Sequence, residues 1–566
     1  MTDILQILND LLLRSLTQYA ERLRLFANSS LSGLEPWQIL AYGVGLTLLF
    51  AGVYDLLFNW PVPLTTRVRA AFFTFVRRLP IIGALIQAQL EKTVMTVKRT
   101  IVSRDKSQVY RTELPKGGMS RDELMREIET MEKLLQPVHN NWKAGRVSGA
   151  VYHGGNELTE MLTEIYGRCA WANPLHPDVF PHVRKMEAEV VQMCVKLFNG
   201  GEDGCGSMTS GGTESILMAC LSYRQEGYAR GVRYPEIVAP VSCHAAFEKA
   251  AHYFQMKLVH IPVDSETRKC DVRAMARAIN KNTVVVVASA PHFPHGIIDP
   301  VEEIAKLAMK HNVGCHVDCC LGGFLLPFME DAGFPVAPFD FRVPGVTSIS
   351  CDTHKYGFAP KGSSVVLYHS RELRARQFFV STDWQGGIYA TPTLAGSRAG
   401  SVIAGCWATL MLMGKSGYVD ATRKIISTAK KIEEAVRKID GVYVLGEPQM
   451  SVIAIGSNDF DIYRLAGALT QRGWNLNSLQ FPPSVHICCT LPHTKEGVAE
   501  LLISDIQECV AEIMKHPAEK STGSAAIYGL AQSIPDRNLV KDIALAFLDA
   551  CLIADPEDAS KSDNHD

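Results

Sequence analysis

Residues 283–318, TVVVVASAPHFPHGIIDPVEEIAKLAMKHNVGCHVD, contain the pattern that decides the fold. They open with a fully apolar run, 283–288, which is typical of a buried strand. Helical periodicity follows from Val301, and a second apolar run, 313–317, leads into Asp318. A strand, a helix and a second strand in this order predict a parallel pair of strands joined by a crossover helix.

The same alternation continues on both sides of this segment. Four further apolar runs are expected to form strands: 236–240, 257–263, 346–350 and 364–368. Stretches with helical periodicity lie between several of these runs, for example DVRAMARAI, which begins at Asp271. Apolar strands alternating with amphipathic helices predict an α/β fold whose mostly parallel sheet is covered on both faces. Ligands of such sheets bind at the carboxyl ends of the strands.

The composition limits the classes of function. The 566 residues carry a net charge of −2, so no general basic surface for nucleic acid is expected. The 15 cysteines are scattered without the Cys/His spacing of zinc sites, so no metal site is predicted. Reduced, mostly buried thiols are expected instead, which favours a catalytic body in the cytosol.

One apolar segment is longer than all the others. Residues 37–54, WQILAYGVGLTLLFAGVY, carry no charge and could cross a hydrocarbon core of ~30 Å. We predict a transmembrane helix over 37–58, with a buried core helix as the alternative. No small-residue cleavage site follows, which favours an uncleaved signal-anchor. Arginines follow the segment more closely than they precede it, so the C-terminal body is expected in the cytosol. The nearest are Arg67, Arg69, Arg77 and Arg78.

A loop of small residues precedes a helical stretch at 205–215, CGSMTSGGTES. The N–H groups and the positive dipole end at the start of a helix bind anions, so a phosphate is expected at Ser210–Thr213. A capped turn without any ligand is the commoner use of such a loop. Further along, His244 in SCHAAFEKA could stack on a flat ring or simply begin a helix.

Two charged residues follow apolar strands. Asp318 would be costly to bury without a cationic partner, such as a pyridinium nitrogen, although a cap or an ordinary ion pair is the alternative. Lys355 lies in 348–364, SISCDTHKYGFAPKGSS, beside His354. A partly desolvated lysine has a lowered pKa and attacks aldehydes as a free amine. An anion loop, a histidine, an aspartate and a lysine on one sheet are together what pyridoxal phosphate (PLP) needs.

Long passages of the chain resemble one family. They are EPWQILAYGV, NPLHPDVFP, TSGGTESILMAC, THKYGFAPKGSS, TDWQGGIYATPTLAGSR and WNLNSLQFPPSVHICCT. They are similar to fold-type I PLP enzymes related to the group II decarboxylases, and most of all to the eukaryotic sphingosine-1-phosphate lyase family. The resemblance implies a large domain with a mostly parallel seven-stranded sheet, and a smaller C-terminal α+β domain.

We therefore divide the chain into seven parts. They are a lumenal N-terminal segment (1–36), the transmembrane helix (37–58), a basic juxtamembrane linker (59–110), an N-terminal segment of the catalytic body (111–170), the large PLP-binding domain (171–405), the small C-terminal domain (406–520) and a C-terminal extension with a disordered tail (521–566). The linker could lie on anionic lipid or be simply solvated.

The resemblance also implies roles for individual residues at the cofactor. They are Lys355 as the Schiff-base lysine, Asp318 as the partner of the pyridinium nitrogen, His244 as the ring that stacks on the cofactor, Asn173 as a hydrogen-bonding partner of the ring, Gly212 and Thr213 at the cofactor phosphate, and His354 near that phosphate. Lys355, Tyr152 and His354 form the expected catalytic group.

On the substrate side, the resemblance makes His176 and Lys361 contacts of the substrate phosphate. It makes Tyr152 a catalytic tyrosine at the mouth of the active site. Gly386 and Gly387 resemble a loop that reaches into the cofactor site of the partner subunit. That loop implies an obligate homodimer with active sites at the subunit interface.

The implied activity is that of a carbon–carbon lyase, sphinganine-1-phosphate aldolase. Such an enzyme cleaves sphingosine 1-phosphate and related phosphorylated sphingoid bases to a long-chain aldehyde and phosphoethanolamine, in sphingolipid catabolism. The implied location is the endoplasmic reticulum membrane. The nearest rival is an amino-acid decarboxylase on the same fold, which would not explain the apolar segment. A scaffold that has lost catalysis is disfavoured because every expected reactive residue is present.

Overall fold

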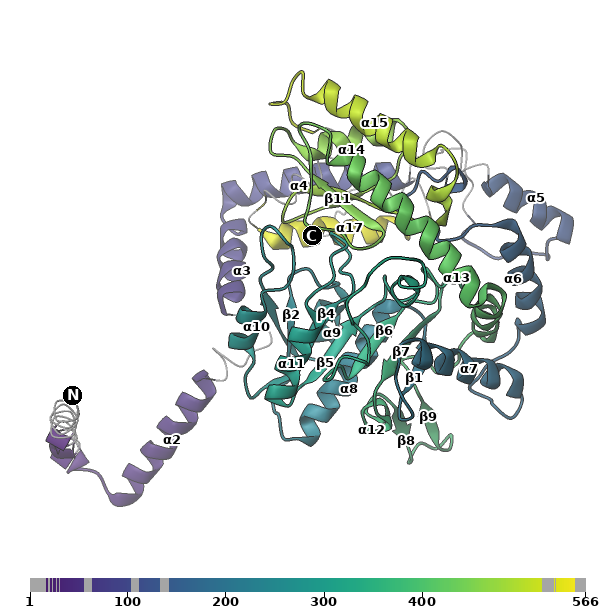
Figure 1. The fold of residues 1–566 in the computed structure, drawn as a ribbon. Helices are drawn as coiled ribbons and strands as arrows, with labels where there is room; N and C mark the ends of the chain where they lie inside the picture. Colours follow the sequence, from purple (N-terminus) through teal and green to yellow (C-terminus); the bar gives the residue numbers. More distant parts are fainter. Residues whose placement is uncertain are drawn as a thin grey trace, which may run out of the picture. The chain divides into compact units, whose positions relative to one another are not determined.

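The computed structural model describes residues 31–54, 64–102, 111–132, 142–521 and 536–554, with Ile534 and parts of 17–29. The chain divides into two compact units, residues 1–67 and 68–566 (Figure 1).

The first unit contains one long apolar helix, α2 (Pro36–Tyr54). Its window Pro36–Val53 has a mean hydropathy of 1.4, and none of that window is buried. The helix is therefore long and apolar enough to cross a membrane, and its exposure argues against the alternative of a core helix. Residues 55–58, the expected end of the span, lie outside the described residues.

The second unit is built around a seven-stranded sheet with the order β1-β7-β6-β5-β4-β2-β3. Its strands are β1 (Cys205–Thr209), β2 (Glu236–Pro240), β3 (Lys257–Ile261), β4 (Thr283–Ser289), β5 (Gly314–Asp318), β6 (Ser348–Cys351) and β7 (Ser364–Tyr368). The five neighbouring strands β3, β2, β4, β5 and β6 pair in parallel. Strand β7 runs antiparallel to both of its neighbours, β6 and β1. The predicted mostly parallel sheet is confirmed, and each expected strand is present.

Alternate residues of the strands enter two separate cores. Val286 of β4 packs in the core that includes side chains of α7 (Pro181–Leu197) and α11 (Val301–His311). Its neighbours Val285 and Val287 pack in the core that includes α8 (Gly212–Ala229) and α9 (Ala246–Tyr253). Because both faces of β4 are covered, its sequence is apolar at nearly every position instead of alternating. Two short helices complete this domain: α10 (Val272–Ala278) and α12 (Arg371–Ala375).

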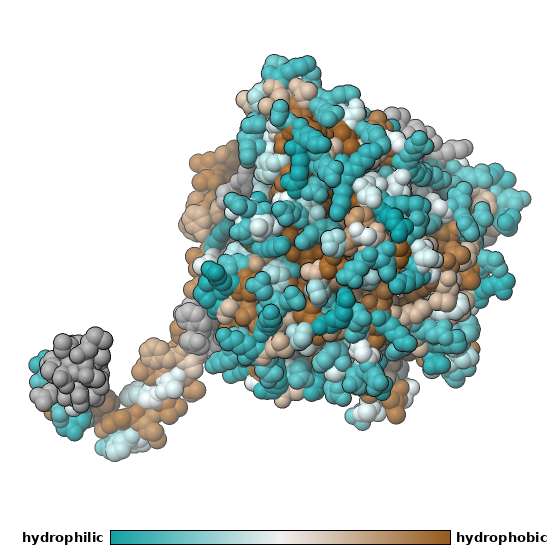
Figure 2. Space-filling model, viewed as in Figure 1, coloured by the Kyte–Doolittle hydropathy of each residue, from teal (hydrophilic) through white to brown (hydrophobic). Residues whose placement is uncertain are grey.

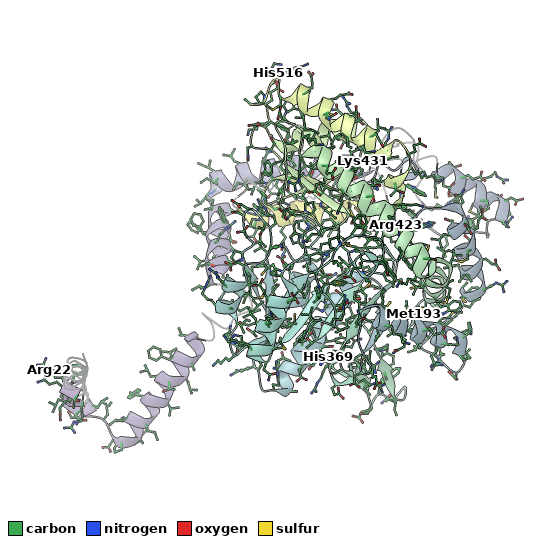
Figure 3. The ribbon with its side chains drawn as sticks, in the orientation of Figure 1. Arg22, Met193, His369, Arg423, Lys431 and His516 are labelled. Atoms are coloured by element: carbon green, nitrogen blue, oxygen red, sulfur yellow. The ribbon has the colours of Figure 1, made fainter. Side chains whose placement is uncertain are left out.

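A smaller α+β domain follows, as the resemblance implies. Its antiparallel sheet has the order β10-β11-β13-β12, with β10 (Tyr443–Val444), β11 (Val452–Gly456), β12 (Asn477–Leu479) and β13 (Ser484–Cys488). Helices α14 (Ile462–Gln471) and α15 (Val498–Ile513) belong to the same domain. The long helix α13 (Gly400–Val436) connects the two domains and is kinked at Gly414, so the expected boundary at 405/406 falls inside a helix. Figure 3 labels Met193 on α7 of the large domain and Lys431 on α13 beside the small one.

The remaining elements lie around these two domains. They are α3 (Leu64–Arg77), α4 (Pro80–Val102), α5 (Arg121–Glu132), α6 (Asn156–Cys169), α17 (Arg537–Ala550), the hairpin strands β8 (Phe379–Ser381) and β9 (Tyr389–Thr391), and the 3₁₀ turns η3 (Trp142–Ala144), η4 (Leu326–Phe328) and η5 (Leu491–Thr494). The expected linker is thus largely helical where it is described, and α4 packs along α17 of the C-terminal extension. The tail from Asp555 lies outside the described residues.

Candidate active site

Two strand ends bring the central acidic residue and the lysine segment together. β5 ends at Asp318, which pairs in register with Ser350 of β6, so residues 352–355 leave the sheet beside it. Asp318 is buried, and its Oδ1 accepts hydrogen bonds from the Cys320 N–H (3.0 Å) and the Ser350 hydroxyl (3.3 Å). These donors hold a carboxylate in a fixed orientation at the carboxyl edge of the sheet, where the sequence places a ligand.

The Lys355 amine forms an ion pair with a second buried carboxylate. Its Nζ lies 2.9 Å from Asp352 Oδ2, and Asp352 is 2% exposed. Burial alone would lower the pKa of Lys355, but the charge and hydrogen bond of Asp352, with further contributions from Cys320 and Tyr152, together raise it. Asp352 is missing from the residues expected from the sequence. The signal that marks Asp318, an acidic residue directly after an apolar strand, marks Asp352 equally well.

The loop before α8 lies against this ion pair. A Cβ atom on Gly212 would be 2.7 Å from Asp352 Oδ2, and one on Gly211 would be 3.3 Å from the ring of His354. Any side chain at position 212 would therefore displace the carboxylate that binds Lys355. Thr213 is the second residue of α8, whose first N–H groups have no partner within the helix. The loop thus lies beside the carboxylate that pairs with Lys355, and its expected role as a phosphate site stays a prediction.

His354 lies between the glycine loop and the carboxylate. Its Nδ1 accepts a hydrogen bond from the Ser363 N–H at 3.1 Å, and its Nε2 is 3.7 Å from Asp352 Oδ2. Burial lowers the pKa of His354 despite the nearby carboxylate. The ring is therefore neutral near pH 7 and can both donate and accept a hydrogen bond.

Tyr152 and Lys361 lie together near the amine. The Lys361 ammonium is 4.8 Å from the centre of the Tyr152 ring and 3.4 Å from the carbonyl oxygen of His354. Burial raises the pKa of Tyr152, with a further contribution from Cys488 of the small domain, so its phenol stays protonated. Tyr356 packs edge-on against Tyr152, and its hydroxyl donates to the carbonyl of Cys489 at 2.6 Å. The sequence did not indicate these small-domain contacts, because nothing local to β13 predicts them.

His244 follows β2 on the same edge of the sheet. Its side chain is exposed, and its Nδ1 accepts a hydrogen bond from the Ala246 N–H at 3.1 Å. The preceding residue, Cys243, lies near Asp318: burial raises the pKa of Cys243, and the Asp318 charge raises it further. The ring of His244 is therefore exposed at this edge of the sheet, and its expected stacking role stays a prediction.

Asn173, His176, Gly386 and Gly387 have no hydrogen bond or ion pair with Lys355 within the described part of this chain. Asn173 braces another segment, because its side chain donates to the Ser397 hydroxyl (3.0 Å) and accepts from the Arg398 N–H (3.2 Å). His176 is exposed. Gly386 and Gly387 lie in the exposed turn between β8 and β9, where Gly387 has a φ of 103°. Their expected roles stay predictions.

Comparison with known proteins identifies the family. The model of the pyridoxal-dependent decarboxylase conserved domain matches residues 108–456. Sphingosine-1-phosphate lyase 1 of Rattus norvegicus is 51% identical, over 96% of this chain and 95% of its own. The chain belongs to the sphingosine-1-phosphate lyase family. The family's enzyme from Saccharomyces cerevisiae is 43% identical, over 84% of this chain and 82% of its own.

Solved structures agree with this family membership. The sphingosine-1-phosphate lyase of Burkholderia pseudomallei has a TM-score of 0.69 at 41% identity, covering 72% of this chain and 94% of that one. A glutamate decarboxylase of Lactobacillus brevis has a TM-score of 0.63 at 19% identity, covering 74% and 97%. The second likeness shows the shared fold alone. The expected fold-type I architecture is thereby confirmed, and the decarboxylases are distant relatives.

PLP is the cofactor of this family, and the residues present fit it. A glycine at position 212 leaves open the space that a Cβ would fill beside Asp352. The Oδ1 atom of Asp352 is buried without a hydrogen-bond partner among the described residues. A partly buried amine, a carboxylate on the neighbouring strand and a helix N-terminus are the groups that an aldehyde, a pyridinium nitrogen and a phosphate require.

Proposed function

We propose that this chain is a PLP-dependent lyase that cleaves sphingosine 1-phosphate and related phosphorylated sphingoid bases to a long-chain aldehyde and phosphoethanolamine. The observation that carries the proposal is the Lys355 amine, 2.9 Å from a buried carboxylate beneath the glycine loop, in a chain about half identical to named sphingosine-1-phosphate lyases. The names of those relatives support the choice of substrate.

Each cofactor-binding residue has a separate role. Bound PLP supplies an electron sink for the carbon that carries the substrate amine. Lys355 holds the cofactor covalently, and Asp318 keeps a proton on the ring nitrogen. Gly212 and Thr213 bind the phosphate through the start of α8. The remaining cofactor contacts are His244 against the ring face, Asn173 at the ring edge and His354 near the phosphate.

The substrate residues position a phosphate and control a proton. Lys361 and His176 bind the substrate phosphate, Lys361 as a mobile point charge. Tyr152, whose pKa is raised by burial, enters the reaction as a hydrogen-bond donor. It can therefore orient the C3 hydroxyl of the substrate before that hydroxyl loses its proton. The neutral His354 beside it can carry a proton between the substrate and solvent.

The assembly and the location are part of the same proposal. The β8–β9 turn with Gly386 and Gly387 reaches the cofactor site of a second copy, so the active enzyme is a homodimer. Exposed apolar side chains on this hairpin support an interface there; they are Phe379, Val380, Trp384 and Ile388. Helix α2 anchors the chain in the endoplasmic reticulum membrane with the catalytic body in the cytosol, which the arginines after α2 support.

The test is conversion of sphingosine 1-phosphate by the detergent-solubilised full chain with PLP, followed by mass spectrometry of the aldehyde. We expect aldehyde from the wild type and none from Lys355→Ala, which should also lose the visible absorbance of the bound cofactor. Lys415→Ala, which alters an exposed lysine paired with Asp331, is the control. Release of carbon dioxide from glutamate or an aromatic amino acid, without aldehyde formation, would replace this proposal by a decarboxylase.

A further inference from the structure

Helices α3 and α4 meet in a sharp corner. α3 ends at Arg77, α4 begins at Pro80, and the two helix axes are bent by 98°. The Gly83 N–H donates to the carbonyl of Leu79 at 2.7 Å, and a Cβ on Gly83 would lie 2.2 Å from the carbonyl oxygen of Arg77. Only glycine permits the backbone to approach so closely, so the corner depends on a glycine at this position.

The outside of this corner is apolar. Six large apolar side chains, each between 43% and 78% exposed, form what we name the corner patch: Val68, Phe72, Phe75, Ile81, Ile82 and Leu85. Val68, Phe72 and Phe75 are spaced i, i+4, i+7, which places them on one stripe of α3. Brown side chains gather over α3 and α4 at the left of the view in Figure 2. Exposed apolar side chains in such a contiguous group mark a binding surface.

The corner is fixed to the catalytic body. Arg77 donates from Nε to Asp536 (2.6 Å) and from Nη1 to Asp542 (2.8 Å), both on or beside α17. At the other end of α4, Lys98 lies 3.9 Å from Asp549 of the same helix. The patch is therefore a surface of the folded body, because α17 clamps the helix that carries half of it.

The sequence around the corner patch indicates which kind of surface it binds. Residues 55–63 join the end of α2 to the start of α3, and nine residues reach at most about 35 Å. A chain anchored by α2 therefore keeps α3 close to the membrane surface. On the helical wheel of α3, Arg67 and Arg69 flank the apolar stripe, one on each side. An apolar stripe between cationic side chains is the pattern of a helix that lies in the interface of an anionic leaflet.

We propose that the corner patch is an interfacial membrane-binding surface, whose aromatic and aliphatic side chains enter the acyl boundary of an anionic leaflet. This rests on the membrane anchoring stated in the proposed function and gives the body a second attachment besides α2. The corner lies in the interface and does not cross the bilayer, because Arg77 and the carboxylates that bind it would have to enter the hydrocarbon. A body held in this way stays beside a substrate that is itself a lipid.

The test uses the full chain with one labelled cysteine. Cys551 is the one exposed cysteine of the 15, so Cys551→Ser gives a background in which an added thiol can be labelled selectively. Phe75→Cys places the label in the patch, and Met309→Cys on α11, which is 51% exposed, is the matched control. Each carries an environment-sensitive fluorophore and is reconstituted into phosphatidylcholine vesicles with or without phosphatidylserine, containing lipids with a quencher on the acyl chain.

We expect quenching at position 75 to exceed that at position 309 by about threefold or more, and to increase with phosphatidylserine. Flotation of the same vesicles reports the α2 anchor separately. If the chain floats but the label at position 75 is not quenched, the proposal for the corner patch is overturned and the α2 anchor is retained. A chain that does not float overturns both. The label at position 75 could instead become shielded in detergent as the protein concentration rises, with no quenching by lipid. That result would show that a second copy of the chain covers the corner patch, and it would overturn the membrane proposal.

Discussion

Two groups of buried ionisable side chains show opposite solutions to the same problem. At the active site, Asp318 and Asp352 are buried, and the partly buried Lys355 faces the Asp352 carboxylate at 2.9 Å. Where the large domain meets β13, three histidines are buried without a carboxylate partner among the described residues; they are His292, His295 and His486. Lys355 keeps its charge because Asp352 lies beside it, whereas the histidines stay neutral because their burial is not offset.

The histidine group is held by neutral contacts. His292 and His486 bond to the carbonyls of Arg268 (3.2 Å) and Pro294 (2.9 Å), and the His292 and His295 rings lie 5.3 Å apart. Burial lowers the pKa of His292 and His486 to about 4 and that of His295 to about 3. A carboxylate partner is thus what distinguishes the charged lysine from the neutral histidines.

The largest effect is expected from removing the charge of Asp318 while keeping its shape. Asp318→Asn should lower kcat for aldehyde formation by about 10²-fold or more, because a preorganised charge at the reacting centre is lost. The steady-state rate with saturating PLP measures it. Asp505→Asn, which changes a buried aspartate bonded to Trp474 in the small domain, is the matched control. Comparable losses of kcat in the two variants would show that the substitutions act through folding and not through the active site.

A smaller effect is expected from removing the partner of the lysine. In Asp352→Asn, burial remains but the carboxylate is gone, so the pKa of Lys355 should fall from its raised value. The cofactor aldehyde reacts only with the neutral amine, so capture of PLP by apoenzyme at pH 7 should be about tenfold faster or more. Stopped-flow absorbance at several pH values measures this rate. An unchanged pH dependence would show that Asp352 does not set the charge of Lys355.

The sheet could be predicted because its signals are local, and so could the place of Asp318 and Lys355 after apolar strands. Each apolar run became a strand, Asp318 ends β5, and Lys355 follows β6. Asp352 carries the same local signal as Asp318 but was overlooked, and only the fold shows that its buried carboxylate meets the Lys355 amine. The contacts of Tyr356 with the small domain link positions over 130 residues apart, and no periodicity reports such pairing.

The helical linker illustrates a different limit. Its arginines suggested a solvated or lipid-bound connector, yet α4 packs along α17, and Arg77 at the end of α3 pairs with Asp536, almost 460 residues away in sequence. The amphipathic period of α3 is visible in the sequence, but these contacts with the C-terminal extension are not. Long-range docking of this kind cannot be derived from local pattern.

Acid should weaken the domain contact that the three buried histidines form. The three histidines have an ordinary pKa near ~6.5 when unfolded, and lower values when folded, so the unfolded chain binds more protons. Stability is then complete above about pH 6.5 and falls toward pH 4, by about 1.4 kcal/mol per pH unit for each histidine. Urea unfolding of the solubilised chain from pH 7.5 to 5 measures the slope. His295→Phe, which removes two ring nitrogens without hydrogen-bond partners among the described atoms, should flatten it; an unaltered slope would assign the acid sensitivity elsewhere.

The smallest effect concerns ion pairs that water reaches. Arg77 and Lys355 are similarly exposed, at 26% and 23%, but their partners differ. Asp536 and Asp542 are 10% and 38% exposed, whereas Asp352 is 2% exposed, so solvent screens the pairs of Arg77 more strongly. Arg77→Met keeps most of the side-chain packing and should cost about 1 kcal/mol, seen as faster hydrogen exchange in α17 while kcat is unchanged. Arg437→Met, which breaks an exposed pair with Glu433 within α13, should leave exchange in α17 as it is. If Arg77→Met lowered kcat as strongly as Asp318→Asn, the clamp on α4 would belong to the catalytic machinery.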